Sequence, residues 1–263
     1  MAKERKNKIW SREETIIAFN VYCKLPFKDH RETNPEVQKY AKLIGRTPDA
    51  VKMKIANFWR LDPALGKGLP HGGKMDKKVW DEFHGNWKNL VDESERLIAE
   101  YAAAYTANHS GERIADVAGD YETNFPRGEE QERVVLGRKN QRFFREGILS
   151  SYKEKCCITG LKVPSLLIAS HIMPWSTNEQ ERLNLHNGLC LNALHDKAFD
   201  RGLITVSTDY KVMLSSEIRH LNASKAAVKK FFGKYDGKKI TLPEKFFPEK
   251  EFLEHHNNNI FKE

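Results

Sequence analysis

Leu166-Leu167-Ile168-Ala169-Ser170-His171-Ile172, followed by Asn187-Gly188-Leu189-Cys190-Leu191 and residues 192–202, decides the fold of the C-terminal half. Its first four residues form an apolar run with the length of a strand, too short for a helix, and the strand carries His171 at its end. The Asn-Gly pair is typical of a turn and precedes a second apolar strand. In 192–202 the apolar residues recur at helical spacing, and the final glycine can end the helix. This order predicts two strands and a short helix packed over them.

Three polar side chains of this stretch form a candidate hydrolytic site. His171, at the end of a strand, can act in its neutral form as a general base toward water. His195, on the helix, can hold a divalent ion that stabilises charge on a phosphate and its leaving oxygen. Asn187 can hydrogen-bond backbone across the loop and keep the two histidines in register. These residue types suit a phosphodiesterase that uses one metal ion.

The same stretch resembles the HNH endonucleases, a family with a ββα-metal site, and most closely its restriction-type branch. The resemblance rests on short motifs in the family's order: Cys157-Ile158-Thr159-Gly160, Ala169-Ser170-His171-Ile172-Met173-Pro174, Asn187-Gly188-Leu189-Cys190-Leu191 and His195-Asp196-Lys197-Ala198-Phe199-Asp200-Arg201-Gly202-Leu203. It implies that His171 and Asn187 are catalytic and that His195 is a ligand of Mg²⁺ or Mn²⁺.

Two departures from the family pattern bear on metal binding. Many relatives have a metal-binding Asp or His directly before the catalytic His, where this chain has Ser170, a poor ligand for a hard cation. Asp200 is our candidate for the second protein ligand, with Asp196 or water as alternatives. Many relatives also hold a structural zinc with two Cys-x-x-Cys pairs, whereas Cys157 and Cys190 each lack a cysteine three residues on. We therefore expect no structural zinc and an apolar core in its place.

A basic segment precedes these motifs. A helix is expected from Leu136 to Tyr152, and Arg138, Arg142 and Arg145 lie on one side of it at helical spacing. Such a side can grip DNA phosphates without reading sequence, or it is an ordinary solvated face. The segment also resembles the one that leads into the cysteine motif of the family.

The first part of the chain shows strong signals for helix ends. Ser11, followed by a glutamate three residues later, forms a capping box that opens one helix. Asn34-Pro35 opens a second helix, Gly45 ends it, and Thr47 caps a third.

The second and third helices follow the logic of a helix-turn-helix motif. They are joined by a short turn that contains glycine, and the third helix has a polar face that includes Lys52 and Asn57. The glycine-rich, basic segment 61–74 fits a wing that touches phosphates, or a flexible linker. We expect DNA contact here, with a plain three-helix packing unit as the alternative.

The composition of the whole chain excludes several classes of protein. No apolar run approaches the roughly eighteen residues of a membrane helix, and the charged N-terminus lacks the apolar part of a signal peptide. Four cysteines, two of them adjacent, are few for a disulfide scaffold in 263 residues, so we expect a reducing cytoplasm. The formal net charge of +8 is consistent with a nucleic-acid partner.

These observations predict an α+β chain. We expect a helical DNA-binding module at 1–88, helix-turn-helix or winged-helix-like, a connecting helix and linker at 89–135, and an HNH nuclease domain at 136–263 with its motif core at 156–206. The expected function is restriction-type cleavage of double-stranded DNA in defence against foreign DNA, with dependence on modified bases left open. A homing, repair or nicking nuclease is one alternative, and a DNA-binding regulator with an inactive nuclease domain is another. A homodimer is the default form for double-strand cleavage.

Overall fold

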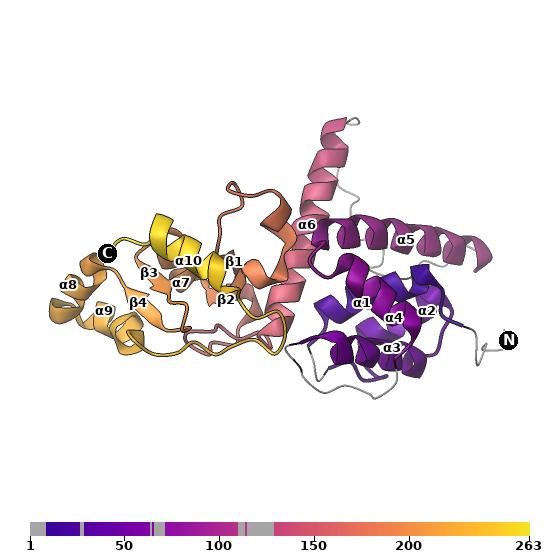
Figure 1. The fold of residues 1–263 in the computed structure, drawn as a ribbon, viewed down its shortest axis with the longest axis horizontal. Helices are drawn as coiled ribbons and strands as arrows, with labels where there is room; N and C mark the ends of the chain where they lie inside the picture. Colours follow the sequence, from indigo (N-terminus) through magenta and orange to yellow (C-terminus); the bar gives the residue numbers. More distant parts are fainter. Residues whose placement is uncertain (1–8, 27–28, 64, 66–71, 110–113, 115–128) are drawn as a thin grey trace. The chain divides into compact units, whose positions relative to one another are not determined.

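The chain divides into two compact units, residues 1–146 and 147–263 (Figure 1). The first unit is helical and the second contains both small sheets, which confirms the α+β class. No helix of the described ranges combines the length and the apolarity needed to cross a bilayer. The computed structural model describes residues 9–26, 29–63, 65, 72–109, 114 and 129–263, without the side chains of 129–139 and 222–224.

Local signals set the helix ends in the first unit. Ser11 Oγ accepts from the backbone N–H of Glu14 at 3.2 Å, and the Glu14 carboxylate accepts from the backbone N–H of Ser11 at 3.1 Å, which confirms the capping box. Gly45 ends the second helix at φ +66°, a conformation that favours glycine. The helices are α1 (Arg12–Lys24), α2 (Pro35–Ile44), α3 (Pro48–Leu61), α4 (Lys74–Phe83), α5 (Trp87–Asn108) and α6 (Glu129–Ser151), which continues into the second unit.

Helix α1 is the centre of the first unit. It packs against α3, α4 and α5, and ten of its thirteen residues are buried. Helix α5, assigned by the sequence to a connector, also packs against α1 and α2. Every element of this unit within the described residues is a helix, and the segment expected to form a wing lies largely outside those residues.

The site in the second unit is built on the two strands and the helix that the sequence predicts. Strand β1 (Leu167–His171) pairs antiparallel with β2 (Gly188–Asn192), and His171 lies opposite Gly188. Helix α7 (Ala193–Asp200) follows β2 at once, because Asn192 caps it by accepting from the backbone N–H of His195 at 3.0 Å. Helix α7 packs on both strands. This places the end of β1 and one face of α7 at the same edge of the unit.

Later elements cover this ββα arrangement. Strands β3 (Ile204–Val206) and β4 (Val212–Leu214) form a hairpin that contacts α7. Helices α8 (Ser216–Ser224) and α9 (Ala226–Phe231) follow, and α10 (Lys250–Asn259) packs against β3. Buried apolar side chains from all these parts form the core, among them Leu189, Leu191, Phe199, Val206, Leu214 and Leu253.

Candidate active site

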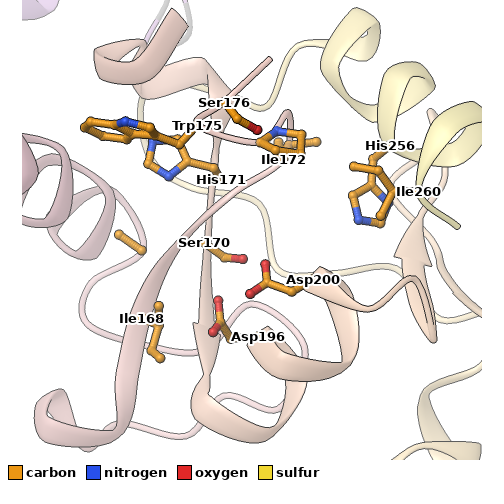
Figure 2. Close-up of a pocket in the computed structure, with 12 residues that line it drawn as sticks. Ile168, Ser170, His171, Ile172, Trp175, Ser176, Asp196, Asp200, His256 and Ile260 are labelled. Atoms are coloured by element: carbon orange, nitrogen blue, oxygen red, sulfur yellow. The ribbon is translucent and has the colours of Figure 1, made fainter. Parts of the chain in front are cut away.

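A hollow of about 700 Å³ lies at the end of β1, where β1, α7 and α10 meet. We call it the His171 pocket. It brings together three polar types of side chain, namely imidazole, hydroxyl and carboxylate, from segments that are apart in the sequence (Figure 2). Its lining consists of Ile168, Ala169, Ser170, His171, Ile172, Pro174, Trp175, Ser176, Asp196, Asp200, His256 and Ile260.

The ring of His171 is held in one tautomer. Its Nε2 lies 2.9 Å from the carbonyl oxygen of Arg182, and because a carbonyl only accepts, Nε2 carries the hydrogen. Burial lowers the pKa of His171, an effect that the Arg182 carbonyl and the charge of Asp200 oppose. The ring is therefore neutral near pH 7, and its Nδ1 carries the basic lone pair.

Asn187 closes the loop that separates the two strands. Its Oδ1 accepts from the backbone N–H of Met173 at 2.8 Å, and its Nδ2 donates to the carbonyls of Met173 at 3.2 Å and Glu181 at 3.3 Å. The side chain is 1% exposed, so these bonds are shielded from water. Since Arg182 follows Glu181 directly, the same bonds fix the carbonyl that orients His171.

Two carboxylates and one hydroxyl face each other in the pocket. Asp196 and Asp200 are four residues apart on α7 and share one face, and Ser170 projects toward them from β1 (Figure 2). Burial raises the pKa of Asp196; the Ser170 hydroxyl opposes this effect, and the charge of Asp200 adds to it. Ser170 Oγ is buried, and its only interaction among the described residues is with the Asp196 carboxylate. A cation would stabilise this arrangement, because its positive charge would offset the repulsion between the two carboxylates and its coordination shell could include the Ser170 hydroxyl oxygen.

The donor set fits a hard divalent cation. Mg²⁺ and Mn²⁺ take oxygen ligands and keep several waters, so two carboxylates and a hydroxyl suffice as the protein's share. Within the described residues, no group of three or more side chains of His, Cys, Asp or Glu is placed to hold a metal ion, so the protein's share here is two carboxylates and one hydroxyl.

The structure does not bring His195 together with His171. His195 is adjacent in sequence to Asp196, and one residue along a helix turns the side chain by about 100°. Its Nε2 donates to the carbonyl of Phe231 at 3.0 Å, and its Nδ1 accepts from Asn192 Nδ2 at 2.8 Å. Burial lowers the pKa of His195, which favours this neutral ring. His195 thus lines a different pocket from His171, whereas Asp196 and Asp200 line the His171 pocket together.

The thiols of Cys156, Cys157 and Cys190 are buried, as expected, and a polar cluster around Asn192 lies beside Cys156. Asn192 Nδ2 lies 3.5 Å from Cys156 Sγ, 3.3 Å from Thr159 Oγ1 and 2.8 Å from His195 Nδ1. The four residues occur as two pairs, each with two residues between its members, which is the spacing of a Cys-x-x-Cys pair. Asparagine thus joins these segments by hydrogen bonds.

The C-terminal helix contributes a residue that sequence reasoning missed. His256 is 1% exposed, stacks on the Phe199 ring with centroids 3.7 Å apart, and its Nε2 donates to the Phe199 carbonyl at 3.2 Å. It thereby holds the last turn of α7 directly before Asp200. No local pattern marks this role, because the contact spans 57 residues of sequence.

The side chains proposed to contact DNA differ in whether they are already bonded to other residues of the chain. Lys52 Nζ lies 2.6 Å from a Glu32 carboxylate oxygen, and Asn57 Nδ2 donates to the buried Asp76 at 2.8 Å, so both are engaged within the first unit. Arg142 Nε donates to Glu146 at 2.7 Å on the solvent side of α6. Arg145 is exposed, and the side chain of Arg138 lies outside the described ones.

Comparison with known proteins agrees with this geometry. Residues 156–207 match the family model described as HNH endonuclease, a segment that includes β1, β2, α7 and β3. This part of the chain is therefore an HNH domain, the type of domain that occurs in nucleases. No curated protein matches the chain.

Proposed function

We propose that this protein is a metal-dependent endonuclease that hydrolyses phosphodiester bonds in double-stranded DNA. The observation that carries the proposal is the position of His171, whose basic nitrogen belongs to a neutral ring in the same pocket as the oxygen donors. A base for water and a set of ligands for a hard cation are the two requirements for one-metal hydrolysis of a phosphate ester.

His171 is the proposed general base. Its Nδ1 takes a proton from a water molecule, and the water oxygen bonds to phosphorus while the bond from phosphorus to the 3′-oxygen breaks. The leaving oxygen takes a proton from solvent. The Arg182 carbonyl keeps the ring oriented through Nε2, and Asn187 keeps that carbonyl in place, so neither residue needs to touch the DNA.

Asp196, Asp200 and Ser170 are the proposed ligands of Mg²⁺ or Mn²⁺. When bound, the ion supplies positive charge beside the phosphate and the leaving oxygen. The two carboxylates would hold the ion, and His256 holds the turn of α7 that carries Asp200.

A plasmid-cleavage assay with Mg²⁺ or Mn²⁺ tests the proposal. His171→Ala should reduce the cleavage rate by about 10²- to 10⁴-fold, the usual contribution of a general base. His220→Ala is the matched control, because His220 is an exposed histidine of the same unit. Plasmid that stays intact with the wild-type protein on every substrate, or a His171→Ala variant as fast as wild type, refutes the proposal.

Metal titration separates the two assignments of ligands. Asp196→Asn and Asp200→Asn should raise the Mn²⁺ concentration needed for half-maximal cleavage, with Asp209→Asn on an exposed turn as control. His195→Gln should leave that concentration unchanged. The reverse pattern would restore His195 as the ligand.

A restriction role is the finer part of the proposal. The order of motifs from Cys157 to Leu203, which resembles the restriction-type branch, supports it, and the helical first unit is the proposed DNA-binding module. Cleavage at defined sites, compared on methylated and unmethylated plasmids, tests both the role and a requirement for modified bases. Random cuts or nicks would favour a repair or nicking nuclease. Cleavage of both strands at one site predicts a homodimer, which size-exclusion chromatography with DNA measures.

Ser170 favours one alternative of another class. It stands where many HNH enzymes have a metal-binding side chain, so the domain also fits a DNA-binding regulator that has lost cleavage. Tight DNA binding without cleavage at any Mg²⁺ or Mn²⁺ concentration would support that function.

A further inference from the structure

A second hollow, of about 500 Å³, lies at the other end of α7. We call it the Phe231 pocket. Ala193, Leu194 and His195 from the start of α7 line it, whereas Asp196 and Asp200 line the His171 pocket, and the two pockets share no lining residue. Its size is that of a small-molecule site. The function proposed above leaves it without a role.

The Phe231 pocket is unusually apolar for a surface. Among the described residues, eight large hydrophobic side chains are exposed, and four of them line this pocket: Leu161 at 37%, Leu166 at 51%, Leu194 at 47% and Phe231 at 48%. Such a concentration of exposed apolar surface marks a binding site more often than chance. Phe231 is the aromatic member of these four.

The rim of the pocket carries positive charge only. Lys230 and Lys234 line it, no Asp or Glu does, and neither lysine forms an ion pair with a described residue. Each ammonium lies near the ring of its neighbour, 5.9 Å from the Phe231 centroid for Lys230 and 4.8 Å from the Tyr235 centroid for Lys234. The pocket therefore favours an anionic group next to an apolar body.

Thr159 places a hydrogen-bond donor in the pocket. Its Oγ1 accepts from the backbone N–H of Leu161 at 3.2 Å and from Asn192 Nδ2 at 3.3 Å. The hydroxyl hydrogen has no acceptor among the described residues, so it is available to a ligand.

We propose that the Phe231 pocket binds one unpaired nucleotide of a DNA strand. The base stacks on Phe231 and packs on the leucines, the Thr159 hydroxyl donates to an acceptor at the base edge, and Lys230 and Lys234 hold the phosphate. A nucleotide combines a flat apolar body, acceptors at its edge and an anion, which are the features that the lining matches. This inference rests on the proposed function for the choice of DNA as ligand.

Fluorescence anisotropy of the full-length protein in EDTA tests the proposal without any cleavage. The probes are a fluorescein-labelled ten-nucleotide oligothymidine and the same strand in a duplex. Phe231→Ala should weaken binding of the single strand about tenfold, the loss typical of one stacked base, with far less effect on the duplex. Lys230→Ala with Lys234→Ala should also weaken it, whereas Lys225→Ala with Lys229→Ala, outside the pocket, should not.

Three further variants test whether the effect is merely structural. Thr159→Val removes the donor at nearly constant size and should weaken binding, and Thr159→Ser should restore it. Phe231→Leu keeps the apolar bulk and loses the aromatic face, so it should behave like Phe231→Ala while it keeps the wild-type unfolding temperature.

The outcomes separate this proposal from the proposed function. Single-strand binding that is unchanged in the Phe231 and Thr159 variants refutes the nucleotide site, even if the wild type cuts plasmid. A change of oligomeric state on Phe231→Ala, seen by size-exclusion chromatography, also refutes it, because the pocket is then a protein interface. Binding that depends on these residues in a protein that never cuts DNA supports the site and refutes only the nuclease.

Discussion

Protonation of His256 should destabilise the second unit in mild acid. The ring is sealed between Phe199 and β3, and its Nδ1 lies 2.8 Å from Thr205 Oγ1 while Nε2 donates to the Phe199 carbonyl. The hydrogen on Nε2 is thus committed to the Phe199 carbonyl, and burial disfavours the charged ring. Burial lowers the pKa of His256 to about 4; the Phe199 carbonyl opposes this effect, and the charge of His255 adds to it.

The magnitude follows from that pKa. A drop in the pKa of His256 from the ordinary 6.5 to about 4 corresponds to a contribution of about 3 kcal/mol to the free energy of unfolding. Because the pKa is lower in the folded state, the unfolded chain binds the proton more readily. The contribution is therefore complete above pH 6.5 and is lost as the pH falls toward 4.

Urea denaturation between pH 7.5 and 4 measures this contribution. His171 and His195 also have lowered pKa values, and carboxylates begin to titrate in this range, so the wild-type curve alone does not isolate His256. His256→Gln keeps a donor toward Phe199 and cannot titrate. Over this pH range, the free energy of unfolding of His256→Gln should fall by about 3 kcal/mol less than that of wild type. The free energy of unfolding of His220→Gln should fall by as much as that of wild type. Equal pH dependence in wild type and His256→Gln would refute the reasoning.

Further changes should have local and separable effects. Gly202→Ala should lower the free energy of unfolding by on the order of 3 kcal/mol, because at φ +68° its Cβ would lie 2.0 Å from the Ile260 carbonyl oxygen. Gly237→Ala, at φ +71° with open space around it, should lower the free energy of unfolding far less. Equal losses for the two variants in urea denaturation would contradict this reasoning. Lys54→Ala should cost about 3–5 kcal/mol, since it leaves the carboxylate of its buried ion-pair partner uncompensated, and a loss no larger than that of an exposed surface lysine would overturn the argument. EDTA should stop cleavage and leave the unfolding temperature nearly unchanged, because the chain's own side chains close the core of the second unit; a large thermal shift would contradict that.

Local chemistry explains which features the sequence predicts. A capping box at Ser11, an asparagine cap at Asn34 and a left-handed glycine at Gly45 depend on neighbours within four residues, and each is found as expected. The position of His171 at a strand end and the closure of its loop by Asn187 are nearly as local, because a turn pair sets where the second strand begins.

Contacts between distant segments explain the rest. The rotation of α7 about its own axis determines whether His195 or Asp196 faces the His171 pocket. In the observed rotation, the carbonyl of Phe231, far along the chain, accepts a hydrogen bond from the His195 ring. The polar cluster around Asn192 likewise joins segments 36 residues apart. Periodicity gives the faces of a helix but not which face meets which partner.

The contact between α10 and the end of α7 has a consequence for synthesis of the protein on the ribosome. His256 emerges about 56 residues after Asp200, which at about 5–20 residues per second is a delay of roughly 3 to 11 s. During that interval the nascent chain has its acidic pair and His171 but lacks one wall of the pocket, which His256 and Ile260 supply. A chain still being translated near DNA should therefore perform the proposed cleavage less well than the released protein.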